Sequence, residues 1–464
     1  MPLEVIGLWL GLSLVLVLVS AVPDCLTRYR WALLALVVVA LGGALALAWT
    51  SPVETLARWR SGLAFDSLAK LLLPPLWTGA AGAMAVAIFL PSGRYEPAIA
   101  ALSTTAATAG ILSGNPLLVI VLLLAIALVI LAGLLVHDEG LMGHPMLNVA
   151  TGIKYLILNV VATACLVMAL LLSNFYSLNP DRTELVRIVA AVFVVGFGLA
   201  AGAMPFYFHI PDTFDATPSL ATVSLAGPLQ CLAVVYLIRT TANGPWLLTD
   251  PHVSDVLMAG AIAGALLAGI MAFGQRRLNR LLAFNAMREL GWIGFGIASV
   301  SRGGWRGALI LLAVRCVSQP LLIVIAKLVQ ARRGEADLEK LGGLAKLLPL
   351  TTFAWCAGVF ASVGLPPAAS FWGLGSLLGF AWSNSRLTAI LLGLSGVLAL
   401  WRLAQASYGT FWRPSAAIAD VLPERPTPSW VLACLGLGLG FAGVAPRVFQ
   451  APLDQVLAYF PFLR

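Results

Sequence analysis

The feature that most limits how this chain can fold is its succession of long apolar runs, each near the ~20 residues that a helix needs to cross a bilayer. About fourteen runs occur, near 5–21, 31–49, 71–91, 96–112, 115–136, 152–173, 186–210, 219–239, 255–273, 281–300, 306–327, 347–383, 387–408 and 428–446. In lipid the backbone must satisfy its own polar groups, so runs of this length predict helices rather than barrel strands. We therefore expect an all-α polytopic membrane protein, a single transmembrane domain over residues 1–464 in contact with the lipid bilayer.

The composition agrees with this fold class and excludes others. Only 10% of the residues are charged, against about 25% in a typical soluble protein, which argues against a disordered chain, a nucleic-acid-binding protein and a cytosolic enzyme. The six cysteines form no CxxC pair and the four histidines no HxxxH pair, so we expect no metal and no cofactor. The sequence also lacks a nucleophile–base pair and a nucleotide loop, so we expect no catalysis by this chain alone.

The basic residues predict the topology. Loops after odd-numbered runs carry thirteen Lys and Arg and the remaining loops eleven, and the densest clusters, 276–280 and 332–346, belong to the first group. Positively charged loops stay in the cytoplasm, which predicts a multi-pass protein of the cell's inner (plasma) membrane with both termini outside the cytoplasm. The polar stretch 328–346 is predicted to be a surface helix or a long loop, and 428–464 a last span with an interfacial tail.

Two runs, the seventh and the twelfth, are interrupted by prolines, which are Pro205, Pro211, Pro366 and Pro367. Proline removes an N–H donor and clashes with the preceding turn, so both helices should be broken near the middle of the membrane. Paired broken helices in two halves of a chain are typical of inverted repeats with a transport site at the breaks. This pattern predicts two inverted five-helix repeats, 96–239 and 255–408. The alternative is that the prolines only kink two packed helices.

Six segments resemble, in one order along the chain, the antiporter-like subunits of respiratory complex I. They are FDSLAKLLLPPLW (65–77), GIKYLILNVVATACLVMALLL (152–172), GFGLAAGAMPFYFHIPDTFDATPS (196–219), RLNRLLAFNAMRELGWIGFG (277–296), GLPPAASFWG (364–373) and LALWRLAQASYGTFWRP (398–414). The third and fifth are similar to the broken seventh and twelfth spans of that family. Together they resemble the proton-conducting membrane transporter family, which includes complex I, multisubunit cation/proton antiporters, membrane-bound hydrogenases of the formate hydrogenlyase kind and partners of inorganic-carbon uptake proteins.

The resemblance implies buried Lys and Glu along the membrane midplane, and most of these are missing. The family's Glu in the fifth span has no counterpart in 115–135. The other positions where a titratable residue is implied are occupied by Ala200, Gln230, Glu289, Arg315, Gln319 and Leu374. Arg stays charged, and Ala, Leu and Gln do not titrate. The family's usual proton path is therefore predicted to be degenerate.

The ionisable residues that remain inside the runs allow two interpretations. Candidates for a rerouted proton path are His209, Glu289, Lys154 and Lys327. Polar residues with a predicted structural role inside the membrane are Arg288, Arg315, Gln230, Gln319 and Arg402. Because Arg288 and Glu289 are adjacent and point in different directions on a helix, Arg315 is the predicted partner of Glu289. His209 is predicted either to relay a proton or to cap carbonyls at the break, and Asp212 and Asp215 to serve in a turn or cap.

Three functions follow as hypotheses. The first is an antiporter-like subunit of a quinone- or hydrogenase-linked complex, with a degenerate proton path and a structural or coupling role beside other membrane subunits. The second is an active proton or cation translocator with a rerouted path. The third is a membrane partner of an inorganic-carbon uptake complex. In none of them does the chain bind a soluble cofactor directly.

Overall fold

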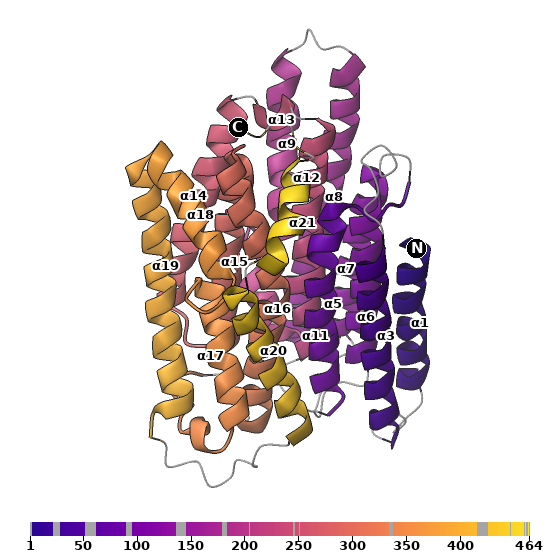
Figure 1. Cartoon of the computed structure of the whole chain (residues 1–464), viewed down its shortest axis with the longest axis vertical. Coiled ribbons are helices and arrows are strands. Elements are labelled where there is room, and N and C mark those ends of the chain that lie inside the picture. Colours follow the sequence, from indigo (N-terminus) through magenta and orange to yellow (C-terminus); the bar gives the residue numbers. More distant parts are fainter. Residues whose placement is uncertain are drawn as a thin grey trace.

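The protein is a bundle of helices in the computed structural model (Figure 1). The structure describes residues 2–21, 28–51, 62–89, 95–135, 145–178, 183–203, 205–244, 246–249, 251–333, 337–414, 426–445, 447–458, 460 and 463. Within these ranges the β contacts are limited to two isolated bridges, Leu63–Ser113 and Arg277–Asp337. The chain is therefore all-helical in the part that the structure describes.

The helices overlap every apolar run of the sequence. The first group comprises α1 (Pro2–Ala21), α3 (Arg30–Thr50), α5 (Ser67–Ala87), α6 (Glu96–Leu112), α7 (Pro116–Leu135), α8 (Pro145–Leu178), α9 (Thr183–Ala201), α10 (Ile210–Ala216), α11 (Ser219–Ser224) and, after the π-helical turn Leu225–Leu229, α12 (Gln230–Asn243). The second comprises α13 (Trp246–Thr249), α14 (Pro251–Phe273), α15 (Leu278–Ala298), α16 (Arg302–Arg333), α17 (Pro349–Val363), α18 (Ser370–Asn384), α19 (Arg386–Ser407), α20 (Pro426–Val444) and α21 (Arg447–Ala458). Nine helical segments among the described residues are long and apolar enough to cross a membrane.

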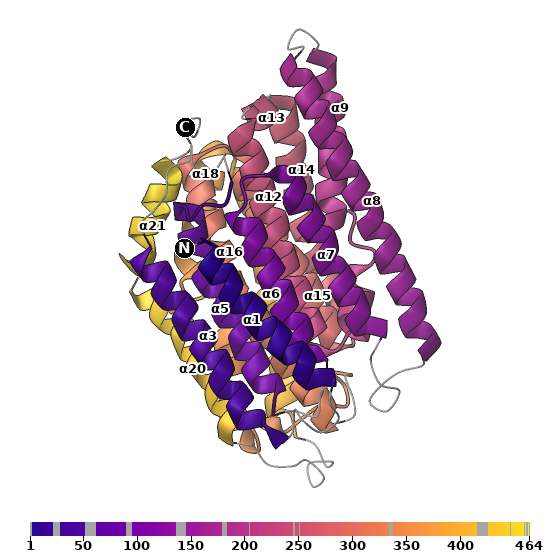
Figure 2. The ribbon, with the colours of Figure 1, turned by 90° about the vertical axis from the view of Figure 1, so that its right-hand side faces the viewer.

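The long helix α16 lies at the centre of the bundle. In its most apolar stretch of 18 residues, 94% of the residues are buried, compared with 28% in α3 and 22% in α8. The outer helices expose large apolar side chains such as Trp31, Val39 and Leu171, as expected where lipid replaces water. Figure 1 shows α1 and α3 on one side of α16, with α14 and α19 on the other, and Figure 2 shows α8 and α9 on the side away from α20 and α21.

Both helices that were predicted to break are interrupted. Helix α9 ends at Ala201 and α17 ends at Val363, and each is followed by a glycine in the left-handed region, Gly202 with φ +67° and Gly364 with φ +86°. This conformation costs other residues about 1–2 kcal/mol, so glycine is suited to end both helices. Pro205, Pro366 and Pro367 lie within the interruptions, and Pro211 lies in the first turn of α10, directly after the first one.

Two further segments, 328–346 and 428–464, can be compared with their predicted forms. The polar stretch 328–346 starts as the last turns of α16, passes through 334–336, which lie outside the described residues, and ends in the 3₁₀ turn Leu344–Lys346. It thus combines a helix end with an irregular segment. In the C-terminal segment, α21 packs against α5 and α16 and buries Leu453 and Val456. The interfacial position of this tail stays a prediction.

Helix α20 lies unusually close to the break between α17 and α18. A Cβ atom at Gly443 would lie 1.8 Å from the carbonyl oxygen of Pro367. The indole N–H of Trp372 donates to the carbonyl of Gly443 at 2.9 Å. Because the nearest atoms belong to the backbone, they cannot yield as a side chain would. Because Gly443 has no side chain, α20 can pack directly against the break between α17 and α18.

We expect Gly443→Ala to lower the apparent melting temperature in detergent, because overpacking of this kind costs about 1–3 kcal/mol. Gly438 on the same helix is the matched control, since a Cβ there meets nothing within 4 Å. Gly438→Ala should be neutral or slightly stabilising, because Ala is a better helix former than Gly by ~1 kcal/mol. Equal melting temperatures for the two variants would contradict the close docking of α20.

Candidate functional site

Polar and charged side chains gather in two groups. The central network, between the two helix breaks, consists of Gln230, Asn285, Arg288, Glu289, Arg315, Gln319 and Ser362. The α10 cluster, around the short helix after the first break, consists of Lys154, His209, Asp212, Asp215, Arg277, Arg280 and Lys327. Together the two groups contain all four residues predicted for a proton path.

The centre of the network is the carboxylate of Glu289, which is 6% exposed. Its Oε2 accepts a hydrogen bond from Nη1 of Arg315 at 2.8 Å, so the predicted partner lies in place. Its Oε1 accepts from the amides of Gln319 at 3.0 Å and Asn285 at 3.3 Å. A buried charge needs both an opposite charge and hydrogen bonds to its remaining lone pairs, and Glu289 has both.

The network joins the two helix breaks. At one end the amide of Gln230 donates to the carbonyl of Ala201, the last residue of α9, at 2.9 Å, and its oxygen accepts from Arg315. At the other end Nη2 of Arg288 donates to the carbonyl of Ser362, near the end of α17, at 2.8 Å. A hydrogen-bonded chain therefore runs from the carbonyls freed by one break to those freed by the other. The structural role predicted for Gln230 and Arg288 stays a prediction.

The network carries one more positive charge than negative. Arg288 and Arg315 face the single carboxylate of Glu289, which lies 4.0 Å from Arg288. The guanidinium of Arg288 also lies over the ring of Trp292, 4.0 Å from its centre, an interaction that favours a desolvated cation. Within the described residues, Nη1 of Arg288 has no hydrogen-bond partner. Arg does not lose its proton in proteins, so this positive charge is fixed.

In the α10 cluster, cations surround two aspartates. Asp212 lies 3.0 Å from Lys154 and 3.0 Å from Arg280. Asp215 lies 2.5 Å from Arg277 and 3.4 Å from Arg280. Both aspartates were predicted to serve in a turn or cap. Asp212 lies in the first turn of α10, and both aspartates also form ion pairs that the sequence did not predict. The sequence pattern missed this because their partners come from α8 and the start of α15, far along the chain.

Lys327 and His209 complete this cluster. The ammonium of Lys327 donates to the carbonyls of Thr217 at 2.8 Å and Asp215 at 3.4 Å, at the end of α10. His209 is 1% exposed, and its ring lies 5.7 Å from that of Tyr155. Among the described residues its Nδ1 has no hydrogen-bond partner, and its side chain makes no capping hydrogen bond at the start of α10. Both roles predicted for His209, a proton relay and a cap on the carbonyls of the break, stay predictions.

Apolar side chains separate the two groups. On α16, Lys327 follows Gln319 by about 12 Å along the axis, at 1.5 Å per residue. The side chains between them are buried and apolar, among them Leu322, Ile323 and Ala326. No hydrogen bond joins the central network to the α10 cluster within the described ranges. The structure thus brings Lys154, His209 and Lys327 together and leaves Glu289 apart from them.

Arg402 has a role at a helix end. Its guanidinium donates to the carbonyl of Ala272 at 3.2 Å and to that of Gln275 at 2.5 Å. Ala272 lies in the last turn of α14, where intrahelical donors run out, and Gln275 lies just after the end of this helix. A cation there also interacts favourably with the helix dipole. The contact ties α19 to α14.

Sequence reasoning missed two buried carboxylates. Glu96 accepts hydrogen bonds from the hydroxyl of Ser219 at 2.6 Å and the N–H of Leu220 at 2.9 Å, at the start of α11. Asp66 accepts from the N–H of Ala69 at 2.9 Å and pairs with Arg239, which is 5% exposed. Arg239 was counted with the loop charges, and this was wrong. An Asp just before an apolar run is an N-cap signal, but its distant partner leaves no local pattern.

Residues 117–399 match the protein family described as NADH:quinone oxidoreductase/Mrp antiporter, TM. The chain is 28% identical over 278 residues to NAD(P)H-quinone oxidoreductase chain 4 1 of Synechococcus sp. (strain JA-3-3Ab), a match that covers 57% of this chain and 52% of that protein. The matched region is thus about half of that relative's length. The chain is also 26% identical over 394 residues to NADH-quinone oxidoreductase subunit N of Paramagnetospirillum magneticum, with 79% of each chain covered.

The fold is similar to that of a chain in the structure of the Mrp complex from Dietzia sp. DQ12-45-1b. The TM-score is 0.83, and the superposition covers 99% of this chain and 98% of that one. The two sequences are 18% identical. At this identity the likeness shows the fold alone.

Proposed function

Because the chain belongs to the NADH:quinone oxidoreductase/Mrp antiporter family of membrane proteins, we propose that it is an antiporter-like subunit of a multisubunit complex related to respiratory complex I or to membrane-bound hydrogenases. In this proposal its own proton path is degenerate, and its role is structural and coupling. It lies in the cell's inner membrane among other membrane subunits, with both termini outside the cytoplasm.

The observation that carries the proposal is the arginine-rich central network. Where the family resemblance implies titratable Lys and His, Arg315 and Gln319 hold the carboxylate of Glu289. A fixed positive charge in the middle of a membrane protein opposes the passage of protons and other cations. The apolar segment between Gln319 and Lys327 removes the connection that a relay would need. We infer that protons do not cross this subunit between its two sides.

The proposed architecture has fourteen spans and two inverted repeats, 96–239 and 255–408. The positions of the breaks support it. The first break follows α6, α7 and α8 and interrupts the next helix, α9. The second follows α14, α15 and α16 and interrupts α17. Each break thus falls in the fourth helix of its repeat.

The test is proton flux in vesicles that contain the complex assembled with its native partners. We expect His209→Ala and the double variant Glu289→Gln/Arg315→Gln to leave the flux unchanged. Removing a group that transfers protons would instead lower the rate by about 10²–10⁴-fold. The double variant keeps the network's charge balance, so a flux change cannot be ascribed to an unpaired buried charge. Loss of flux in either variant, with the complex assembled, would contradict the degenerate path.

The α10 cluster favours one alternative function, an active translocator with a rerouted path. Three of the four predicted path residues, Lys154, His209 and Lys327, converge there, and Lys154 is 42% exposed in its side chain. A proton path that starts at this cluster begins at the partly exposed Lys154 and continues to the buried imidazole of His209. In the flux experiment, a loss confined to His209→Ala would support this alternative.

A further inference from the structure

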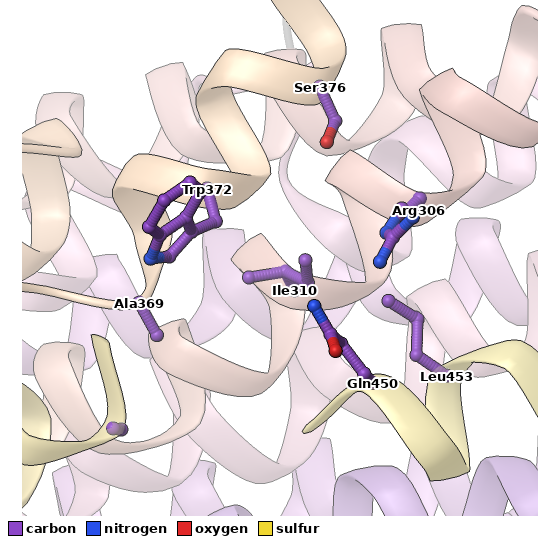
Figure 3. Close-up of a pocket in the computed structure, with 8 residues that line it drawn as sticks. Arg306, Ile310, Ala369, Trp372, Ser376, Gln450 and Leu453 are labelled. Atoms are coloured by element: carbon purple, nitrogen blue, oxygen red, sulfur yellow. The ribbon is translucent and has the colours of Figure 1, made fainter. Parts of the chain in front are cut away.

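A cavity of about 340 Å³ lies apart from both polar groups, between α16, α18, α20 and α21. Its lining residues come from four segments of the chain, and they are Arg306, Ile310, Ala369, Trp372, Ser376, Ala442, Gln450 and Leu453. Figure 3 shows the polar ends of Arg306, Ser376 and Gln450 arranged around one space. None of the described residues lining the cavity is acidic.

The three polar side chains lack partners in the part of the chain that the structure describes. Arg306, Ser376 and Gln450 form no hydrogen bond or ion pair with another described residue. They come from three different helices and line one cavity. A guanidinium within a membrane protein is costly unless an anion or a polar group meets it. The cavity therefore offers a cation, a hydroxyl and an amide to a ligand from outside the chain.

The rest of the cavity matches an amphipathic ligand. Arg306 lies about one turn after Arg302, where α16 begins, so it lies close to one boundary of the span. Ile310 and Leu453 supply an apolar wall. Trp372 is 50% exposed at the edge, and aromatic side chains of this kind are enriched at the level of lipid headgroups.

We propose that this cavity binds the phosphate of an anionic phospholipid headgroup. The guanidinium of Arg306 donates to the phosphate oxygens, for which its fork geometry is suited. The hydroxyl of Ser376 and the amide of Gln450 supply further donors. The part of an acyl chain next to the headgroup lies along Ile310 and Leu453. The positive charge of Arg306 favours a headgroup with a net negative charge over a zwitterionic one.

The test measures lipid binding by the purified complex in neutral detergent. Phosphatidylglycerol, phosphatidylcholine and inorganic phosphate are each titrated, and bound lipid is counted by native mass spectrometry. We expect phosphatidylglycerol to bind in preference to phosphatidylcholine. Arg306→Gln should weaken phosphatidylglycerol binding about tenfold or more, because it removes a charge-assisted contact. The matched control is Arg302→Gln on the same helix, which removes the same charge from an exposed position outside the cavity.

Four outcomes would overturn the proposal. The first two are an equal affinity of Arg306→Gln and Arg302→Gln for phosphatidylglycerol, and equal binding of phosphatidylglycerol and phosphatidylcholine. The third is competition by inorganic phosphate at concentrations that account for all the binding. The fourth is lipid binding that appears only once the neighbouring subunits are removed. The third outcome would indicate a free anion and the last a partner protein. If Arg306→Gln fails to fold, Gln450→Ala provides the comparison, because Gln450 is exposed and its amide carries no charge.

Discussion

Replacing Glu289 with Gln is expected to destabilise the protein by about 3–5 kcal/mol, the usual effect of removing one partner from a buried ion pair. The variant keeps the shape of the side chain but leaves Arg288 and Arg315 facing each other with no carboxylate nearby. Arg cannot respond by losing its proton, so the network must open or take in water. The measurement is the apparent melting temperature and the yield of monodisperse protein in detergent.

Two controls separate this effect from the loss of any acidic residue. Glu339 forms an ion pair with Arg276 at 3.9 Å on the surface, with side chains 67% and 76% exposed. Glu339→Gln should change stability by at most ~1 kcal/mol, because exposed pairs contribute little. The double variant Glu289→Gln/Arg315→Gln should recover much of the stability, since it removes one charge of each sign. If Glu289→Gln and Glu339→Gln melt at the same temperature, the central network does not hold the bundle together.

The second large effect is expected at the ion pair between Asp66 and Arg239. Asp66→Asn should destabilise the protein by roughly 3 kcal/mol, because it leaves the guanidinium of Arg239, 5% exposed, without its carboxylate. Asn still caps a helix well, so the bond to the N–H of Ala69 is retained in this variant. Asp66→Ala removes the cap as well and should cost about 1 kcal/mol more. Equilibrium unfolding in SDS measures the change in the free energy of unfolding for each of the two variants.

The same pair allows a double-mutant cycle. Arg239 also donates to the carbonyl of Ile111 at 3.0 Å, so the pair joins α5, α6 and α12. Arg239→Gln alone should destabilise the protein as strongly as Asp66→Asn. Together the two changes should cost clearly less than their sum, because each removes the ion-pair partner of the other. Additive costs would show that the two side chains do not interact in solution.

The sequence predicted the helices and their interruptions because both depend on local properties. Apolar runs of about 20 residues become helices wherever lipid removes the alternative partners of the backbone. Proline disfavours a helix locally, although Pro74, Pro75 and Pro320 lie inside continuous helices. The positions 205, 211, 366 and 367 therefore led directly to the breaks. The pairing of Glu289 with Arg315 was also accessible, because adjacent charges on one helix must find partners elsewhere.

The α10 cluster, the helix-end contacts of Glu96, the ion pair of Asp66 and the cavity beside Arg306 could not be predicted in the same way. Asp212 pairs with cations from α8 and α15, and Asp66 with one from α12. Such contacts depend on how distant helices pack, and no periodicity in the chain encodes them. The same holds for Gly443, whose close approach to Pro367 appears only when α20 meets the second break.

By itself, the sequence determined that the chain is an all-helical membrane protein with two broken helices and few titratable residues in its spans, because hydropathy and proline act within a segment. Only the tertiary structure decided where the surviving charges go. It placed Glu289 between two arginines and kept it apart from Lys327, because buried charges must be satisfied by whichever helices pack around them. That arrangement, rather than the count of charged residues, is the reason for proposing a degenerate proton path.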